Sequence, residues 1–367
     1  MVEFSGFSVT PDIGELLDVL WRRKRPKRVH YIELFHDPEV IRHMAERFML
    51  TDNLDKNNPY YALRLNIVVH QFLGFDVFHT TTAGEDYFTL KLNTTKDTAF
   101  QDTNRGERYW MEEHEGPIQN WKDFEIYPWP EVKKIDFSQF EWLEKNIPQN
   151  MGCYDLTAGI LERLTWLTGY ENLCLMIYDN PELVDAICEK VGTFYVKYTE
   201  ALCAFNCVPI IWGSDDMGFH SSTLVSADFL RKKILPWHKR CAEIAHNNKR
   251  PYLLHSCGKL DEIMPDLIND VKIDAKHSFE DAIQPVVEAF HLYSDQIAIL
   301  GGIDVDFLCR SDEKSVRHRV QETLEVCMDQ DSMGKSGYCL GTGNSVANYI
   351  PLDNYLAMLD EGRKFAL

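Results

Sequence analysis

Short apolar runs recur along the chain and alternate with longer stretches that have the period of a helix. Most of these runs end in polar residues or glycine, as expected for strands buried on both faces of a parallel sheet. The eight runs are residues 29–35, 75–80, 152–157, 208–213, 252–257, 273–277, 297–301 and 337–341.

The clearest helical stretch begins at Pro181, because Asp179 or Asn180 can cap it and a proline suits the first turn of a helix. Apolar residues then recur every three or four positions, which is the period of one helix face. A second helix fits residues 226–246, with Ser226 as its cap. Further helices are predicted at residues 282–294, 312–329 and 351–365.

Strands that alternate with helices indicate a parallel sheet, and eight of them favour an α/β fold of the (β/α)8 TIM-barrel type. We expect one domain over residues 1–367, with a helical segment before the first strand. The rival is an open doubly wound sheet, which usually carries a phosphate loop after its first strand. Neither G-x-G-x-x-G nor G-x-x-x-x-G-K-[ST] occurs in the chain, so the barrel is preferred.

The segment between the second and third runs, about residues 82–150, is too long for a barrel loop. It contains an alternating strand pattern at 87–93 and several tryptophans and tyrosines further on. We predict a β-hairpin insertion followed by a loop that folds over one mouth of the barrel.

The charge balance narrows the classes of partner. Lys and Arg number 38 and Asp and Glu 57, giving a net charge of −19, so nucleic acid and anionic membrane are not expected partners. The basic run at 22–28 is either a solvated linker or an anion site. There is no run of 18 apolar residues and no signal-peptide pattern, so a cytoplasmic location is expected, with most of the ten cysteines reduced and buried.

In a barrel, functional side chains sit at the carboxyl ends of the strands. His255 and Cys257 follow the fifth run, and residues i and i+2 of a strand point to the same face. An imidazole and a thiolate at this spacing suit a zinc ion, and Cys339 in the eighth run is the best candidate for a third ligand. Three protein ligands and one open position are typical of a catalytic zinc. The alternative is a buried structural histidine beside inert thiols.

Other strand ends add candidate residues. Asp215 and Asp216, after the fourth run, are candidates for a further ligand, a supporting partner or a general base, or else they lie in a solvated loop or cap a helix. His277 is a catalytic candidate that would contact a substrate, or a satisfied interior histidine. Glu280 is a candidate metal ligand or a helix cap.

At these residues the chain resembles the uroporphyrinogen decarboxylase superfamily, and within it the corrinoid-dependent methyltransferase branch. The resemblance implies a (β/α)8 barrel and a zinc site of the His-x-Cys…Cys kind, matched by His255, Cys257 and Cys339. The Arg-Gln-Ala-Gly-Arg signature of the decarboxylase branch is missing, which argues against decarboxylation. The motifs that carry the resemblance are 178–183 (YDNPEL), 212–218 (WGSDDMG), 255–258 (HSCG), 301–304 (GGID), and 337–343 (GYCLGTG) with Asn344.

The resemblance implies a zinc-dependent methyltransferase that exchanges a methyl group with a cobalamin-type corrinoid carried by a partner protein. The favoured substrate is a methoxylated compound, aromatic or otherwise, that is O-demethylated. A methylcobamide:thiol methyltransferase, a uroporphyrinogen-type decarboxylase and a non-catalytic scaffold are the alternatives. A homodimer is compatible with such a barrel.

Overall fold

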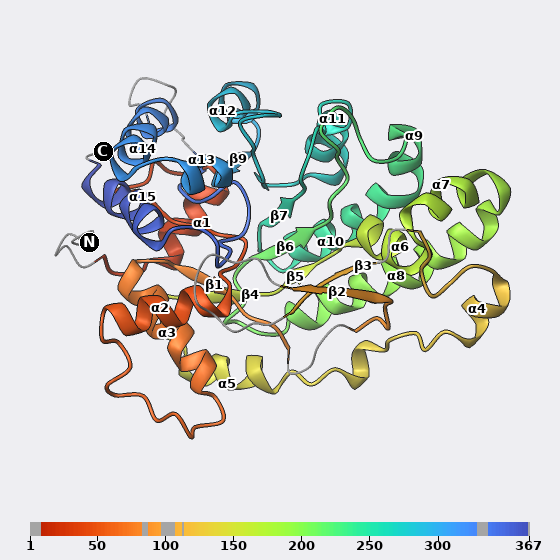
Figure 1. The fold of residues 1–367 in the computed structure, drawn as a ribbon, viewed down its shortest axis with the longest axis horizontal. Helices are drawn as coiled ribbons and strands as arrows, with labels where there is room; N and C mark the ends of the chain where they lie inside the picture. Colours follow the sequence, from red (N-terminus) through yellow and green to blue (C-terminus); the bar gives the residue numbers. More distant parts are fainter. Residues whose placement is uncertain (1–8, 83–86, 97–106, 112–113, 329–336, 366–367) are drawn as a thin grey trace.

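The computed structural model describes residues 9–82, 87–96, 107–111, 114–328 and 337–365. Short parallel strands lie inside a layer of helices, so the fold belongs to the α/β class (Figure 1). The strands of this inner sheet are β1 (Val77–His79), β4 (Gly152–Tyr154), β5 (Leu156–Thr157), β6 (Ile211–Ser214), β7 (Tyr252–His255), β8 (Ala275–His277), β9 (Ala298–Leu300) and β10 (Tyr338–Cys339).

The strands follow the order that the sequence predicts. Six form one parallel sheet in the order β10-β9-β8-β7-β6-β5, and β1 pairs in parallel with β4. Only Asp155 separates β4 from β5, so these two continue one another. At the far edge, Tyr31 forms a parallel bridge with Leu340 beside β10. Within the described residues no ladder joins residues 29–35 to β1, so the closed barrel stays an expectation at that seam.

Side chains from alternate strand positions fill the space inside the sheet, as the period of two in a strand requires. Helix α1 (Ile13–Leu20) packs three leucine or valine side chains into the same interior, which confirms the helical segment expected before the first strand. Full burial of one such side chain is worth about 1.5–3 kcal/mol. The interior cluster includes Ile32, Val77, Tyr154, Trp212, Leu253, Ala275, Leu300 and Cys339.

Helix α8 (Pro181–Leu202) begins at the predicted proline. The helix predicted at 226–246 is present as α9 (Ala227–Phe229), a π-helical turn (Leu230–Ile234) and α10 (Leu235–Asn247), with Ser226 accepting a hydrogen bond from the backbone N–H of Phe229. The remaining helices are α2 (Pro38–Arg47), α3 (Tyr61–Leu73), α6 (Ile160–Thr168), α7 (Tyr170–Asp179), α11 (Met264–Asp266), a second π-helical turn (Leu267–Val271), α12 (Val286–Tyr293), α13 (Val305–Arg310), α14 (Glu313–Cys327) and α15 (Leu352–Lys364).

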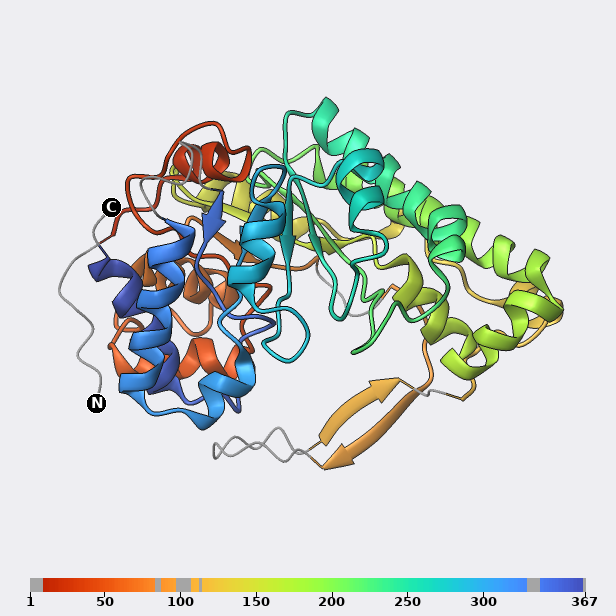
Figure 2. The ribbon, with the colours of Figure 1, turned by 90° about the horizontal axis from the view of Figure 1, so that it is seen from above.

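The predicted insertion after β1 contains an antiparallel hairpin of β2 (Leu92–Lys96) and β3 (Glu107–Met111), which stands apart from the helices in Figure 2. The hairpin starts later than residues 87–93 because Tyr87 and Phe88 pack on aromatic rings of α8. Phe137 stacks on Tyr198 of the same helix, so this part of the insertion covers the outer side of α8. The insertion also contains α4 (Trp121–Ile126), a 3-10 turn (Val132–Lys134) and α5 (Ser138–Asn146).

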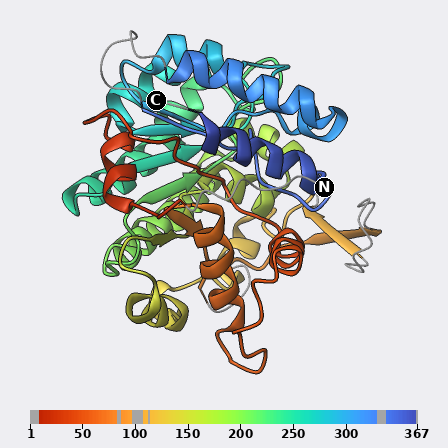
Figure 3. The same cartoon turned by 90° about the vertical axis from the view of Figure 1, so that its left-hand side faces the viewer.

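The basic run at 22–28 is partly used for structure. Arg28 forms an ion pair with the buried Asp76, and Arg22 donates to the backbone oxygen of Ser294 at 3.0 Å. At the end of the chain α14 and α15 lie side by side (Figure 3), joined by Arg317 and Asp360 at 2.7 Å. In the described part of the chain, no helix combines the length and apolar character needed to cross a bilayer.

Candidate metal centre

Three side chains that could hold a metal ion meet where β6 and β7 end. Asp216 lies two residues beyond β6, His255 is the last residue of β7, and Cys257 follows two residues later. The Nε2 atom of His255 lies 3.4 Å from the Sγ atom of Cys257 and 3.4 Å from Oδ1 of Asp216. All three potential ligand atoms lie within 4.8 Å of one another. The predicted pairing of His255 with Cys257 is therefore present, and Asp216 joins it.

These distances fit a tetrahedral zinc ion. Bond lengths of about 2.0 Å to nitrogen or oxygen and 2.3 Å to sulfur place tetrahedral ligand atoms about 3.5 Å apart for S···N and 3.3 Å apart for N···O. The observed separations are both 3.4 Å. Nitrogen, sulfur and carboxylate oxygen are also the donors that zinc prefers. The Asp216 side chain is 37% exposed, so the group is open to a small molecule.

Hydrogen bonds hold the donor atoms in place. The backbone N–H of Cys257 donates to Oδ1 of Asp216 at 2.7 Å. Burial of Asp216 opposes ionisation, but its contacts with His255 and with the backbone N–H of Cys257 outweigh it and bring the pKa of Asp216 to about 2. Burial, with Asp216 nearby, raises the pKa of the Cys257 thiol. Ser278 Oγ and Asn344 Nδ2 each donate to the Cys257 sulfur at 3.3 Å, which favours its anionic form.

Two glycines bring the loops after β6 and β7 into contact. A Cβ atom on Gly218 would lie 2.6 Å from the backbone oxygen of Cys257, and one on Gly258 would lie 2.3 Å from the carbonyl carbon of Gly218. Gly258 also has a φ of +80°, which side-chain-bearing residues rarely adopt. This close approach fixes the loop of Asp216 against the loop of Cys257.

Asp215 lies next to Asp216 but faces the other way. Its carboxylate accepts hydrogen bonds from the backbone N–H groups of Ile160, Leu161 and Glu162 at 2.9–3.0 Å. It also contacts Nε2 of His238 at 2.9 Å and is fully buried. The helix-capping alternative therefore describes its surroundings, because these groups occupy both carboxylate oxygens.

His277 is buried between protein groups. Its Nδ1 lies 2.8 Å from Nδ1 of His255, and its Nε2 lies 3.1 Å from the carbonyl oxygen of Thr342. Both ring nitrogens thus have protein partners, which corresponds to the interior-histidine alternative. Its contact with His255 nevertheless places it directly behind the candidate metal-binding group.

The structure does not bring Cys339 to this group. In the strand register Cys339 of β10 pairs with Leu300 of β9. Leu300 pairs with His277 of β8, and His277 pairs with His255 of β7. Cys339 is therefore three strand spacings of about 4.8 Å from His255 around the sheet. Its side chain lies in the apolar interior cluster, where burial raises its pKa. Asp216, and not Cys339, is the third donor in the described geometry.

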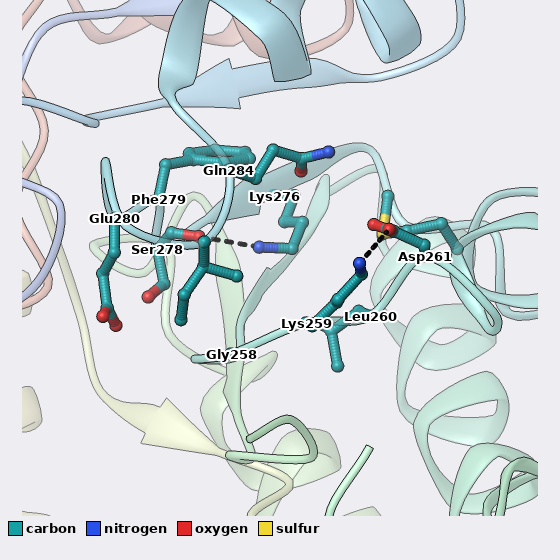
Figure 4. Close-up of a pocket in the computed structure, with 11 residues that line it drawn as sticks. Gly258, Lys259, Leu260, Asp261, Lys276, Ser278, Phe279, Glu280 and Gln284 are labelled. Carbon is teal, nitrogen blue, oxygen red and sulfur yellow. Dashed lines mark hydrogen bonds and ion pairs between the residues drawn. The ribbon is translucent and has the colours of Figure 1, made fainter. Parts of the chain in front are cut away.

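Glu280 lines a small notch together with Gly258, Lys276 and Ser278 (Figure 4). It is not one of the three residues whose ligand atoms lie within 4.8 Å of one another. Burial, followed by the charges of Asp304 and Asp216, raises its pKa. In the same notch Lys276 is 3% exposed and directs its ammonium group at the carbonyl oxygens of Ser256, His277 and Ser278 at 3.3, 3.3 and 2.8 Å. Burial lowers the pKa of Lys276 to about 8. This lysine braces the ends of β7 and β8.

Ser278, Asn344 and Lys276 were not predicted as site residues. Their positions after β8 and β10, or within β8, are the available signal, because the carboxyl ends of the strands converge. Ser278 carries a second sign that only coordinates show, since its φ of +86° is strained for a residue with a side chain.

Comparisons with known proteins agree with this architecture. A methylated-thiol–coenzyme M methyltransferase of Methanosarcina mazei is 28% identical over 192 residues, which cover 52% of this chain and 47% of that protein. The match therefore spans about half the length of that curated relative. A solved structure described as a methyltransferase from Methanosarcina mazei superposes with a TM-score of 0.70 over 96% of this chain and 98% of that chain, at 14% identity, which shows a shared fold. Residues 145–365 match the family model for uroporphyrinogen decarboxylase. This match covers more than half of the sequence, and the chain belongs to the uroporphyrinogen decarboxylase (URO-D) family.

Proposed function

We propose that this protein is a zinc-dependent methyltransferase that moves a methyl group between a small thiol and a corrinoid held by a partner protein. The observation that carries the proposal is the group of Asp216, His255 and Cys257 at the carboxyl ends of the strands. The relative from Methanosarcina mazei is a methylated-thiol methyltransferase, which supports a thiol over other substrates.

The donor set suits an ion that must also engage a substrate. Asp216 and the Cys257 thiolate would together contribute two negative charges, which match a divalent cation, and His255 would contribute a nitrogen lone pair. Three protein ligands leave one position for a small molecule. When bound, zinc supplies Lewis acidity, which favours a thiolate at neutral pH or stabilises an oxygen leaving group.

The surrounding residues control the Cys257 sulfur. The donors from Ser278 and Asn344 hold it toward His255 and reduce its charge density. In the net reaction a carbon–sulfur bond forms on the thiol and the methyl–corrinoid bond breaks. The electron pair of that bond stays with the corrinoid, and the thiol proton is released.

The methoxylated donor favoured by the sequence stays a prediction. It requires the same metal-binding group, because an ether oxygen is also a poor leaving group without a Lewis acid. A substrate panel therefore distinguishes the two versions.

The first test is metal content by mass spectrometry, alongside methyl transfer from methylcobalamin to a panel of thiols. We expect one zinc per chain in the wild type and in Cys339→Ala, and little in Cys257→Ala or Asp216→Ala. Transfer should follow the metal content across the four proteins. The reverse assay supplies methoxylated aromatic compounds and a reduced corrinoid.

A wild type that binds no zinc after reconstitution would refute the proposal. Decarboxylation of a porphyrinogen by the metal-free protein would instead restore the decarboxylase alternative. Zinc loss in Cys339→Ala at unchanged stability would show that the described geometry is not the metal-bound one.

A further inference from the structure

A chain of hydrogen bonds leads from the candidate metal centre into the protein. His255 Nδ1 lies 2.8 Å from His277 Nδ1, and His277 Nε2 lies 3.1 Å from the Thr342 carbonyl oxygen. All three residues are at most 3% exposed, so water does not substitute for any of these partners. Of the four ring nitrogens of His255 and His277, the one outside this series of hydrogen bonds is Nε2 of His255, which faces Cys257 and Asp216.

The positions of the protons follow from what each atom can do. A carbonyl oxygen only accepts, so His277 must carry its proton on Nε2. A 2.8 Å contact between two ring nitrogens holds one proton, which belongs either to His277 or to His255. In the first case His277 would be a doubly protonated cation.

A cationic His277 is disfavoured by its surroundings. It is fully buried against the indole ring of Trp212, and no described carboxylate is hydrogen-bonded to it. Burial of an unpaired charge is costly, and no described residue offers this buried position a countercharge in hydrogen-bond contact. His277 is therefore neutral and accepts at Nδ1, and His255 donates from its own Nδ1.

We propose that His277 is a positioning residue that keeps the proton of His255 on Nδ1 and so reserves Nε2 as the lone pair for the metal. This inference rests on the proposed function, because it concerns the same metal-binding group. His277 thus acts through His255, and it has no free nitrogen for a substrate.

Gly301 makes this arrangement possible. A Cβ atom at Gly301 would lie 2.2 Å from the Thr342 oxygen and 2.9 Å from Nε2 of His277. The absent side chain lets the backbone after β9 pass beside the hydrogen bond. The link between His277 and Thr342 is therefore enclosed by protein.

The experiment compares His277→Gln with His277→Leu. A glutamine amide can accept from His255 at its oxygen and donate to Thr342 from its nitrogen, whereas leucine can do neither. The control is His70→Leu, which breaks another buried imidazole pair, between His70 Nε2 and His36 Nδ1 at 3.3 Å, on the α3 side of the molecule. The readouts are zinc affinity, by competition with a chromophoric chelator, and the tautomer of His255 in the metal-free protein.

The tautomer is read from long-range ¹H–¹⁵N couplings of histidine-labelled protein above the usual imidazole pKa, with His255→Gln for assignment. We expect Nδ1–H for His255 and Nε2–H for His277 in the wild type. Zinc affinity should fall about 10- to 100-fold in His277→Leu, recover in His277→Gln and stay unchanged in His70→Leu.

An Nε2–H tautomer for His255 in the wild type would overturn the inference, and so would equal zinc affinity in His277→Leu and wild type. Neither result would touch the proposed function, which fails only if the wild type binds no zinc or transfers no methyl group. If His277→Leu does not fold, the tautomer of His255 in the wild-type spectrum still decides the question.

Discussion

Replacing Asp215 with alanine should destabilise the protein far more than the loss of an ordinary helix cap. The carboxylate accepts three backbone N–H groups from the first turn of α6 and contacts His238, all at 2.9–3.0 Å. The residue is fully buried, so water cannot replace it. Asp215→Ala would remove four hydrogen bonds and would leave three of the four groups without a described partner, because the N–H of Ile160 also contacts the carbonyl oxygen of Ala158.

The size of the effect follows from these four hydrogen bonds. A bond to a charged group contributes about 1.5–3 kcal/mol, so four at the lower limit give about 6 kcal/mol. Partial relaxation of α6 would reduce this to about 4–5 kcal/mol, which is at the upper end for a single substitution. Asp215→Asn keeps one acceptor oxygen and should lose about half as much.

Urea unfolding followed by tryptophan fluorescence and circular dichroism measures this difference. The control is Asp312→Ala, which removes an exposed cap at the start of α14, where Oδ1 accepts from the backbone N–H of Ser315 at 2.8 Å. We expect a loss of about 1 kcal/mol for that control. An Asp215→Ala loss no larger than the control's would refute the reasoning and return Asp215 to the list of catalytic candidates.

Three further predictions concern buried positions near the strand ends. Burial raises the pKa of Glu33 from 4.5 to about 8. The stability that the neutral carboxyl group contributes is therefore full below about pH 4.5 and is lost as the pH rises through about 8. Between about pH 5 and pH 9 the urea midpoint of the wild type should fall more than that of Glu33→Gln, by the equivalent of roughly 3–5 kcal/mol. Parallel midpoints in the two proteins would contradict the assignment. Gly301→Ala should lower the free energy of unfolding by about 2–3 kcal/mol, measured by thermal unfolding, because the φ of Gly301 is +70° and the added Cβ would overlap Thr342. The control Gly14→Ala in α1 should not lower it. Equal melting temperatures for the two variants would count against the close approach. Cys339→Ser should lose about 1–3 kcal/mol by placing a hydroxyl in the apolar interior, with zinc content unchanged.

The strands were predictable because helices cover the sheet from outside and side chains fill it from within. All four residues of β7 are buried, and the first three are apolar, so the sequence indicates a buried strand there. The run at 29–35 is also mostly buried and mostly apolar, but the structure shows isolated bridges there, at Tyr31 and, just after the run, at His36. Composition indicates burial, whereas pairing depends on neighbouring strands that are distant in sequence.

The pairing of His255 with Cys257 in the candidate metal centre was predictable from spacing, but the third member of the group was not. His255 and Cys257 are two residues apart, so local geometry alone places them together. Assigning Asp216 rather than Asp215 to the candidate site required knowing that the first turn of α6 donates its N–H groups to Asp215. Placing Cys339 required the register across four strands, from β10 to β7, which no local pattern contains.

The contact between Gly218 and Gly258 has a consequence for how this site can change during evolution. Each glycine occupies the space that a side chain on the other would need, so a substitution at one position is not relieved by a compensating change at its partner. Glycine is therefore required at both positions at the same time. A descendant that exchanges Asp216 or Cys257 for another ligand keeps the same frame. A descendant that loses either glycine must rebuild both loops at once.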